Sequence, residues 1–423
     1  MPSVSAESYQ KKSYRHYVLF ILTIAYAFNF IDRQLISILQ ESIKHDLVLS
    51  DTQLGLLSGF AFAIFYVTAG IPFARWSDQG NRKSILSLAV GVWSFMTALS
   101  GACMNYTQLL LARIGVGIGE SAGTPPAHSM ISDIYPERER GTALSVYSVG
   151  INLGIMFGFF LGGLINQYFG WRWAFVIVGA PGILLAVILK VTVAEPKRGW
   201  SDSVDIDDNK VPFKDVLKET YSNPIIKHVL LGAAIFGIGG YGAINWLASF
   251  FIRTHDVGSA ELGLWLSMSI GVVGGIGTFL AGFLSDKFSH HSKGWYMWIP
   301  AIGGFITVPC YVVIFTTNQA SLALWLNFLP SLLLAVYIGP GVAVLHSNVH
   351  QRMRATMSAI FYLMINIIGL GIGPTLIGIL SDALTPTLGA TALREAMLYV
   401  IAPAIAWGSL HFYKAGNLLH KKG

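Results

Sequence analysis

Runs of about 20 mostly apolar residues recur along almost the whole chain and restrict what it can fold into. Twelve such runs lie near residues 17–39, 54–74, 84–104, 108–131, 142–165, 174–192, 226–250, 262–284, 296–316, 321–346, 356–380 and 395–413. Only 12% of the 423 residues are charged, whereas soluble domains average about 25%. The sequence therefore predicts an all-α membrane protein with twelve transmembrane helices.

The distribution of Lys and Arg predicts the orientation of these helices. Of the 28 basic residues, 22 fall in the tails and in the alternate loops on the same side, and four fall in the loops on the other side. Basic residues are enriched on the cytoplasmic side of membrane proteins, so we expect both termini in the cytoplasm. This orientation explains the net charge of +6, and we expect no nucleic-acid partner.

The chain divides into two halves that resemble each other. A polar stretch separates the sixth apolar run from the seventh, which predicts an N-terminal six-helix bundle at 1–194, a cytoplasmic linker at 195–224 and a C-terminal six-helix bundle at 225–423. A Ser-Asp pair that ends in Asp78 recurs at Asp286, and an arginine before the fifth run, Arg140, recurs as Arg354 before the eleventh. Internal repetition of this kind is common in transporter folds.

Four ionisable residues fall inside the predicted spans: Asp32, Arg33, Arg113 and Glu120. A charge at the centre of a membrane helix costs about 2.5 to 3.5 kcal/mol, so such residues mark a functional pathway. Arg113 and Glu120 are seven residues apart and lie nearly on the same helix face, roughly 10.5 Å apart along the axis. We expect them to share a cavity without forming a salt bridge.

Asp32 and Arg33, the charged residues of the first apolar run, lie at a depth in the membrane similar to that of Arg113. An ion pair between Asp32 and Arg113 is therefore geometrically possible. Asn29 precedes Asp32 by three residues and Arg33 by four, so it can form hydrogen bonds on their side of the helix.

These residue types suggest separate roles. A carboxyl group near the bilayer midplane can load and release a proton, which makes Glu120 the main proton-coupling candidate and Asp32 the second. The alternatives are a neutral hydrogen-bonded Glu120 and a permanent structural pair between Asp32 and an arginine. Arg33 and Arg113 stay charged, so they either hold an anionic head group of a substrate or neutralise the two acids.

Metal, cofactor and enzyme chemistry are not expected. His346 and His350 stand one helical turn apart, but no carboxylate or cysteine accompanies them as a further metal ligand. The spans contain no nucleophile with an adjacent base, so we predict that the chain is not an enzyme. Protons are the only coupling ion that we expect.

Two loop motifs resemble the signature G-x-x-x-D-[RK]-x-G-[RK]-[RK] of the major facilitator superfamily. The second copy matches through Gly282, Asp286 and Lys287, and the first keeps Asp78, Arg82 and Lys83 but has Ala74 and Gln79 at two signature positions. The resemblance implies two pseudo-symmetric six-helix bundles and a cytoplasmic gate at this loop. The implied gate residues are Asp78, Arg82, Lys83, Arg140, Asp286 and Arg354.

The chain resembles the Spinster branch of that superfamily in two stretches, Asn29–Arg33 and Arg113–Glu120, and more weakly in a third, Gly170–Phe175. This implies a bacterial inner-membrane protein that moves a lysolipid-like or sphingoid amphiphile by proton-coupled alternating access. Asp32 and Glu120 would respond to protons, and Arg33, Arg113 and Asn29 would lie at the head group. The alternative substrate is a soluble organic anion. We expect a monomer whose partners are this substrate and membrane lipids, and we disfavour a receptor, a channel or a membrane enzyme.

Overall fold

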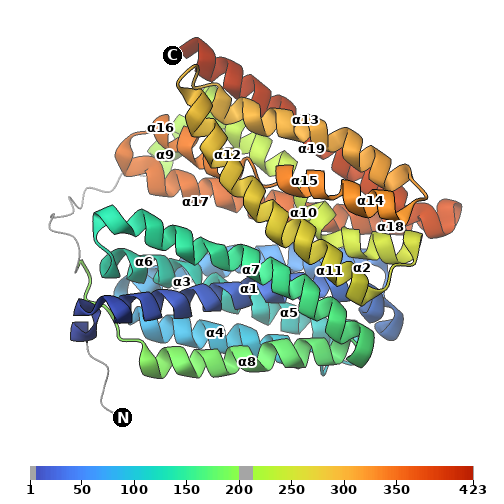
Figure 1. The fold of residues 1–423 in the computed structure, drawn as a ribbon, viewed down its shortest axis with the longest axis horizontal. Helices are drawn as coiled ribbons and strands as arrows, with labels where there is room; N and C mark the ends of the chain where they lie inside the picture. The colour runs from blue at the N-terminus through green and yellow to red at the C-terminus, as the bar shows by residue number, and fades with distance from the viewer. Residues whose placement is uncertain (1–5, 200–212, 423) are drawn as a thin grey trace. The chain divides into compact units, whose positions relative to one another are not determined.

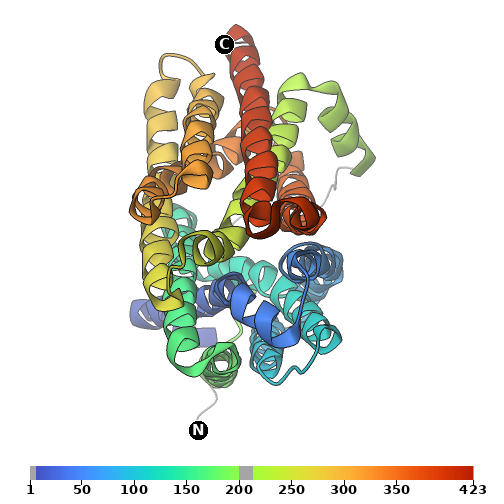
Figure 2. The same ribbon diagram turned by 90° about the vertical axis from the view of Figure 1, so that its right-hand side faces the viewer.

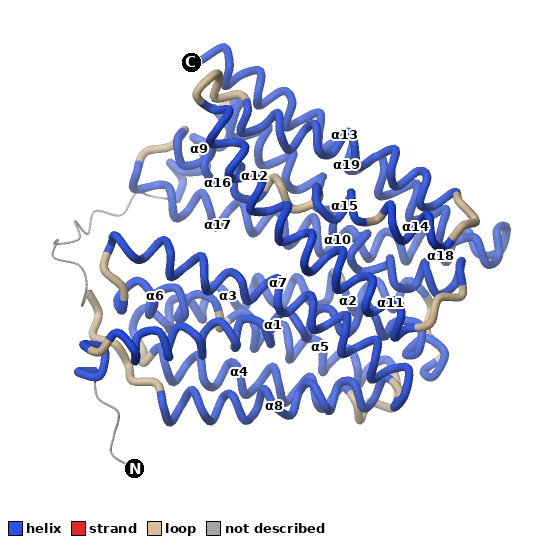
Figure 3. Tube along the Cα trace, in the orientation of Figure 1, coloured by secondary structure: helices blue, strands red, loops and turns tan. Residues whose placement is uncertain are grey.

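The structure, a computed structural model, describes residues 6–199 and 213–422, and every regular element in these ranges is a helix (Figures 1 and 3). The α-helices up to residue 199 are α1 (Lys12–Leu47), α2 (Asp51–Ser58), α3 (Phe60–Gln79), α4 (Arg82–Ser100), α5 (Tyr106–Ser121), α6 (Thr124–Ile134), α7 (Glu137–Phe169) and α8 (Trp171–Thr192). Those from residue 213 onward are α9 (Phe213–Ser222), α10 (Pro224–His255), α11 (Ser259–Leu266), α12 (Gly274–Ser289), α13 (Trp295–Thr316), α14 (Ala320–Leu326), α15 (Phe328–Leu333), α16 (Ile338–Ser347), α17 (Arg354–Met364), α18 (Gly373–Leu388) and α19 (Ala392–Lys422). Two π-helices lie at Ser267–Val273 and Ile365–Ile372, and 3-10 turns lie at Ala6–Gln10, Gln351–Met353 and Gly389–Thr391.

The all-α prediction is confirmed, and the predicted apolar runs fall on helices. By length and composition, ten helical stretches in the described ranges could cross a membrane. The last of these, Gln351–Lys422, contains two of the predicted runs. Another predicted run, 108–131, falls on α5 and α6, which are separated by a turn at residues 122–123 and are each shorter than the roughly 20 residues of a complete span.

Polar caps explain where several helices begin. The side chain of Asn81 accepts a hydrogen bond from the amide of Ser84 at the start of α4. Asn105 caps α5 in the same way, and Asn223 caps α10, in which Pro224 occupies the first helical position. These side chains satisfy amides that have no partner within the helix.

The chain folds into two compact units. Unit 1 contains Met1–Leu49, Ala61–Ile206 and Ser259–Ser267, and unit 2 contains Ser50–Phe60, Asp207–Gly258 and Met268–Gly423. The short helix α2 therefore belongs to unit 2, where it packs on α18, and α11 belongs to unit 1, where it packs on α7. The division at 1–194, 195–224 and 225–423 stays a prediction, and residues 200–212 of the linker lie outside the described residues.

In unit 2 the long helices α10 and α19 pack side by side (Figure 2). Ion pairing fixes α2 in this unit. The carboxylate of Asp382 accepts hydrogen bonds from the backbone amides of Asp51 and Thr52, at 3.0 and 2.8 Å. The side chain of Asp51 accepts two hydrogen bonds from Arg253, each 2.7 Å long. Asp382 thus caps the start of α2 from another helix.

In unit 1 a glycine seam holds α1 against α7. Gly150, Gly154, Gly158 and Gly162 recur every fourth residue of α7. A Cβ atom on Gly154 would lie 2.5 Å from the carbonyl oxygen of Ala27 and 2.5 Å from the Cβ of Phe30. The missing side chains allow the two backbones to approach closely, which fixes the part of α1 that carries Asn29, Asp32 and Arg33.

We expect Gly154→Ala to lower the thermal stability of the purified protein, because the added methyl group overpacks the contact between α1 and α7 by about 1 to 3 kcal/mol. Gly141→Ala is the matched control, since a Cβ atom at this position of α7 would have no neighbour within 4 Å. Melting followed by tryptophan fluorescence measures both variants. Equal melting temperatures for the two would show that the seam is not tightly packed.

Candidate functional site

The intramembrane charges gather in unit 1, between α1 and α5. Asp32, Arg113 and Glu120 are each at most 1% exposed, and Asn29 is 4% exposed. The side chain of Arg33 keeps 14% exposure. Four ionisable groups in so little water are unstable unless they pair with one another or with a ligand.

The ion pair at this site joins Arg33 and Glu120. The Nε of Arg33 donates a hydrogen bond to Oε2 of Glu120 at 2.7 Å. The guanidinium carbon of Arg33 also lies 4.9, 5.1 and 4.8 Å from the ring centroids of Phe30, Phe62 and Tyr66. These distances allow cation–π attraction, so aromatic rings surround the arginine that holds Glu120.

The pair between Asp32 and Arg113 that the sequence allowed is not formed among the described residues. Asp32 and Arg33 both lie close enough to Glu120 to act on it electrostatically, but of the two only Arg33 forms a hydrogen bond with it in the described structure. The structure turns Arg33 toward α5. Arg113 and Glu120 form no salt bridge with each other in the described structure, as expected, and the cavity that the two were expected to share stays a prediction.

Asp32 and Arg113 therefore keep unused bonding capacity. Neither carboxyl oxygen of Asp32 has a hydrogen-bond partner in the described structure, and neither do Nε and Nη1 of Arg113. The guanidinium of Arg113 lies 5.4 Å from the ring of Phe62. Buried polar groups are almost always hydrogen-bonded, so these two are the groups most available to a ligand or a proton.

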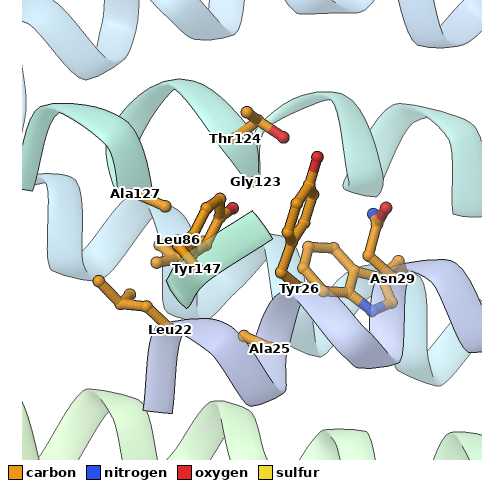
Figure 4. A pocket seen from close by; sticks show the side chains of 10 residues that line it. Leu22, Ala25, Tyr26, Asn29, Leu86, Gly123, Thr124, Ala127 and Tyr147 are labelled. Atoms are coloured by element: carbon orange, nitrogen blue, oxygen red, sulfur yellow. The ribbon is translucent and has the colours of Figure 1, made fainter. Parts of the chain in front are cut away.

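A small cavity lies beside this cluster, next to the end of α5. Figure 4 shows four of the residues that line it, Tyr26 and Asn29 of α1, Thr124 of α6 and Tyr147 of α7, and the rings of Tyr26 and Tyr147 stack with centroids 4.4 Å apart. The cavity has a volume of about 10 Å³, close to the space that one water molecule needs. Trp93 also lines it, and its indole nitrogen has no hydrogen-bond partner. The lining can hold a water molecule near Asn29.

Sequence reasoning missed the uncharged part of this site. Phe62 and Tyr66 belong to α3 and Trp93 and Thr97 to α4, in spans that carry no central charge. Thr97 is completely buried, and its hydroxyl group lies close to Asp32. Aromatic and threonine residues are common in membrane helices, so nothing in their pattern marks these four.

A family model described as the Major Facilitator Superfamily matches residues 22–410. The chain belongs to this superfamily. The crystal structure of a bacterial homologue of the human lysosomal transporter Spinster, in an inward-facing and unoccupied conformation, superposes with a TM-score of 0.87 at 33% identity. The match covers 97% of this chain and 98% of the other. The protein is therefore a superfamily transporter of the Spinster type, with a transporter's fold rather than an enzyme's.

Relatives in the superfamily have names that refer to different kinds of transport. An efflux pump of Mycolicibacterium smegmatis is 32% identical, over 93% of this chain and 91% of its own length. A probable galactarate/D-glucarate transporter of Bacillus subtilis is 29% identical, over 66% of both chains. The sphingosine-1-phosphate transporter SPNS2 of Danio rerio is 29% identical, over 56% of this chain and 48% of its own.

The structure gives Arg82, a residue of the superfamily loop signature, a packing role inside unit 1. Its side chain is 1% exposed, and it pairs with Asp133 and with Glu195, the latter at 2.8 Å. Glu195 also accepts a hydrogen bond from the backbone amide of Lys83. Arg82 therefore ties the segment after α8 to α4 and α6.

The other expected gate residues lie near the surface. Asp78 is exposed, and Asp286 is exposed and accepts a hydrogen bond from the hydroxyl group of Tyr296 at 2.7 Å. Arg354 donates to the carbonyl oxygen of His346 at 3.2 Å, and Arg140 is half-buried. The gate role of these residues, of Lys83 and of Arg82 stays a prediction.

We expect Arg82→Gln to lower the melting temperature strongly, because it leaves the carboxylates of Asp133 and Glu195 without their partner. Removing one member of a buried ion pair costs about 3 to 5 kcal/mol. The matched control is Lys83→Gln, because Lys83 uses its backbone amide to bind Glu195. If Arg82→Gln melts like the control but alters transport, Arg82 belongs to the gate rather than to the packing of unit 1.

Proposed function

We propose that this Spinster-type transporter is proton-coupled and moves a single-chain amphiphile with an anionic or zwitterionic head group, by alternating access. The observation that carries the proposal is the buried cluster in which Arg33 binds Glu120 while Arg113 and Asp32 have spare bonding capacity. The cluster combines proton-binding and anion-binding groups in one place.

The ion pair supplies a way to link protons to substrate. An ionised Glu120 holds Arg33 by a charge-assisted hydrogen bond. When Glu120 takes up a proton, this attraction weakens, and the guanidinium of Arg33 can bind an anionic group beside Arg113 more strongly. Arginine suits this role because it stays charged and can donate two parallel hydrogen bonds. Proton binding and anion binding then favour each other, and by thermodynamic reciprocity each strengthens the other equally.

The rings around the cluster favour an amphiphile over a fully polar solute. Phe30, Phe62 and Tyr66 give Arg33 an apolar surround, against which an acyl or sphingoid chain can pack. The alternative is a soluble organic anion such as a sugar acid, and it is supported by the relationship to the galactarate/D-glucarate transporter. Both substrates would use the same two arginines.

Transport in liposomes tests this function. The purified protein is reconstituted with an inward proton gradient, and the uptake of labelled lysophospholipid, sphingosine-1-phosphate and glucarate is compared. We expect proton-dependent flux of an amphiphile and none of glucarate. Flux of glucarate alone would establish the alternative substrate class, and the absence of proton-dependent flux for all three would overturn the proposed coupling.

A further inference from the structure

A second groove in unit 1 lies apart from the charge cluster, between α3, α4 and α8. Its volume is about 490 Å³, and it is open toward the surface of the molecule. The residues that matter for the argument are Trp76 of α3, Asn81, Ser84 and Leu88 at the start of α4, and Lys190 near the end of α8. The function proposed above makes no use of this groove.

The groove opens on a surface that is built to contact lipid. Leu88 and Phe95 of α4 are exposed, and so are Leu184, Val187 and Val191 of α8. Large exposed apolar faces on helices long enough to span a bilayer contact hydrocarbon. One wall of the groove, at Leu88, continues this apolar surface, so a molecule in the groove can extend a hydrocarbon chain along it.

The opposite end of the groove is polar and positively charged. The Nζ of Lys190 donates a hydrogen bond to the hydroxyl group of Ser84 at 2.6 Å, which leaves its other two N–H bonds available. Lys190 is exposed and forms no ion pair among the residues that the structure describes. Among the described residues, no acidic side chain lines the groove, so the charge of Lys190 is uncompensated there.

Trp76 places this polar end at the boundary of the membrane. Trp76 is 47% exposed, and tryptophan is enriched where the hydrocarbon core meets the head groups. Lys190 lies at the end of α8 that the distribution of basic residues assigns to the cytoplasm. Anionic lipids gather in the cytoplasmic leaflet and attract basic residues there.

We propose that this groove binds an anionic phospholipid of the bilayer, with its phosphate on Lys190 and Ser84 and an acyl chain along Leu88. An amphiphile with a negative head group fits this groove. Its head would meet the ammonium group of Lys190 and the hydroxyl and amide groups of Ser84 and Asn81, and its chain would lie against the apolar wall at Leu88. The lipid is a resident of the membrane and not the transported substrate, so the inference holds whatever the transporter carries.

Native mass spectrometry of the intact protein in detergent tests this site with phosphatidylglycerol and phosphatidylcholine of the same acyl composition. We expect retained adducts with phosphatidylglycerol and about fivefold weaker binding in Lys190→Gln, since one basic residue contributes about 1 kcal/mol to the attraction. Lys190→Arg should keep the binding. Lys414→Gln removes another exposed lysine, on α19 and away from the groove, and serves as the matched control.

A second measurement places the lipid beside Trp76. Phosphatidylglycerol with brominated acyl chains should quench part of the tryptophan fluorescence of the wild type, and this part should be missing in Trp76→Phe. Equal adducts with the two lipids, equal phosphatidylglycerol binding by Lys190→Gln and Lys414→Gln, or unchanged quenching in Trp76→Phe would each overturn the proposal.

Discussion

Glu120→Gln should reduce proton-driven accumulation of the substrate to the level of protein-free liposomes. Glutamine has nearly the shape of glutamate but takes up no proton, and its uncharged amide oxygen accepts a weaker hydrogen bond from Arg33 than a carboxylate does. Anion binding in the variant should therefore depend less on pH than binding by the wild type, which should strengthen as the pH falls. Ligand binding at several pH values, together with uptake under a proton gradient, measures both effects.

Glu261→Gln is the matched control for this prediction, because Glu261 is an exposed glutamate outside the cluster. It should keep both the accumulation and the pH dependence of the wild type. A double variant, Asp32→Asn with Glu120→Gln, removes both buried carboxyl groups of the cluster. Uphill transport at the wild-type rate by this double variant would exclude both residues as proton carriers.

Arg113→Gln should weaken substrate binding by about 10- to 100-fold while leaving thermal stability nearly unchanged. A hydrogen bond to a charged group contributes about 1.5 to 3 kcal/mol, and we assign Arg113 such bonds to the head group. Its Nε and Nη1 have no hydrogen-bond partner within the described residues, so the folded protein without substrate loses no hydrogen bond at these two atoms. Binding titrations and melting curves separate the two quantities.

Arg138→Gln is the control for Arg113→Gln, because the side chain of Arg138 is 84% exposed. It should change neither binding nor stability. A large drop in melting temperature for Arg113→Gln with unaltered binding would contradict the assignment. That result would make Arg113 a residue that only neutralises Asp32 and Glu120.

The charges inside the spans are an example of what a sequence pattern can and cannot predict. Their burial follows from their position in apolar runs, and the structure confirms it for Asp32, Arg113 and Glu120. Which of these charged residues pair with one another does not follow from their position in the sequence. Asp32 and Arg33 are neighbours in the chain and both lie near α5, so the exact rotation of α1 decides which of them forms a bond there, and the structure pairs Arg33 with Glu120.

Arg82 illustrates a different difficulty. The loop signature placed it with the gate residues, and short charged loops usually face solvent. In the folded protein, Asp133 of α6 and Glu195 after α8 converge on it and bury it. These partners are 51 and 113 residues away along the chain, so no local pattern indicates that they meet.

The sequence by itself determined that the chain is an all-α membrane protein, where its apolar runs lie and which charges fall inside them. These properties follow from hydrophobicity along the chain, which acts residue by residue. Only the tertiary structure decided that Arg33 holds Glu120, that Arg113 and Asp32 keep unused bonding capacity, and that aromatic rings of α1 and α3 surround the cluster. The physical reason is that each contact depends on how several helices rotate and pack against one another.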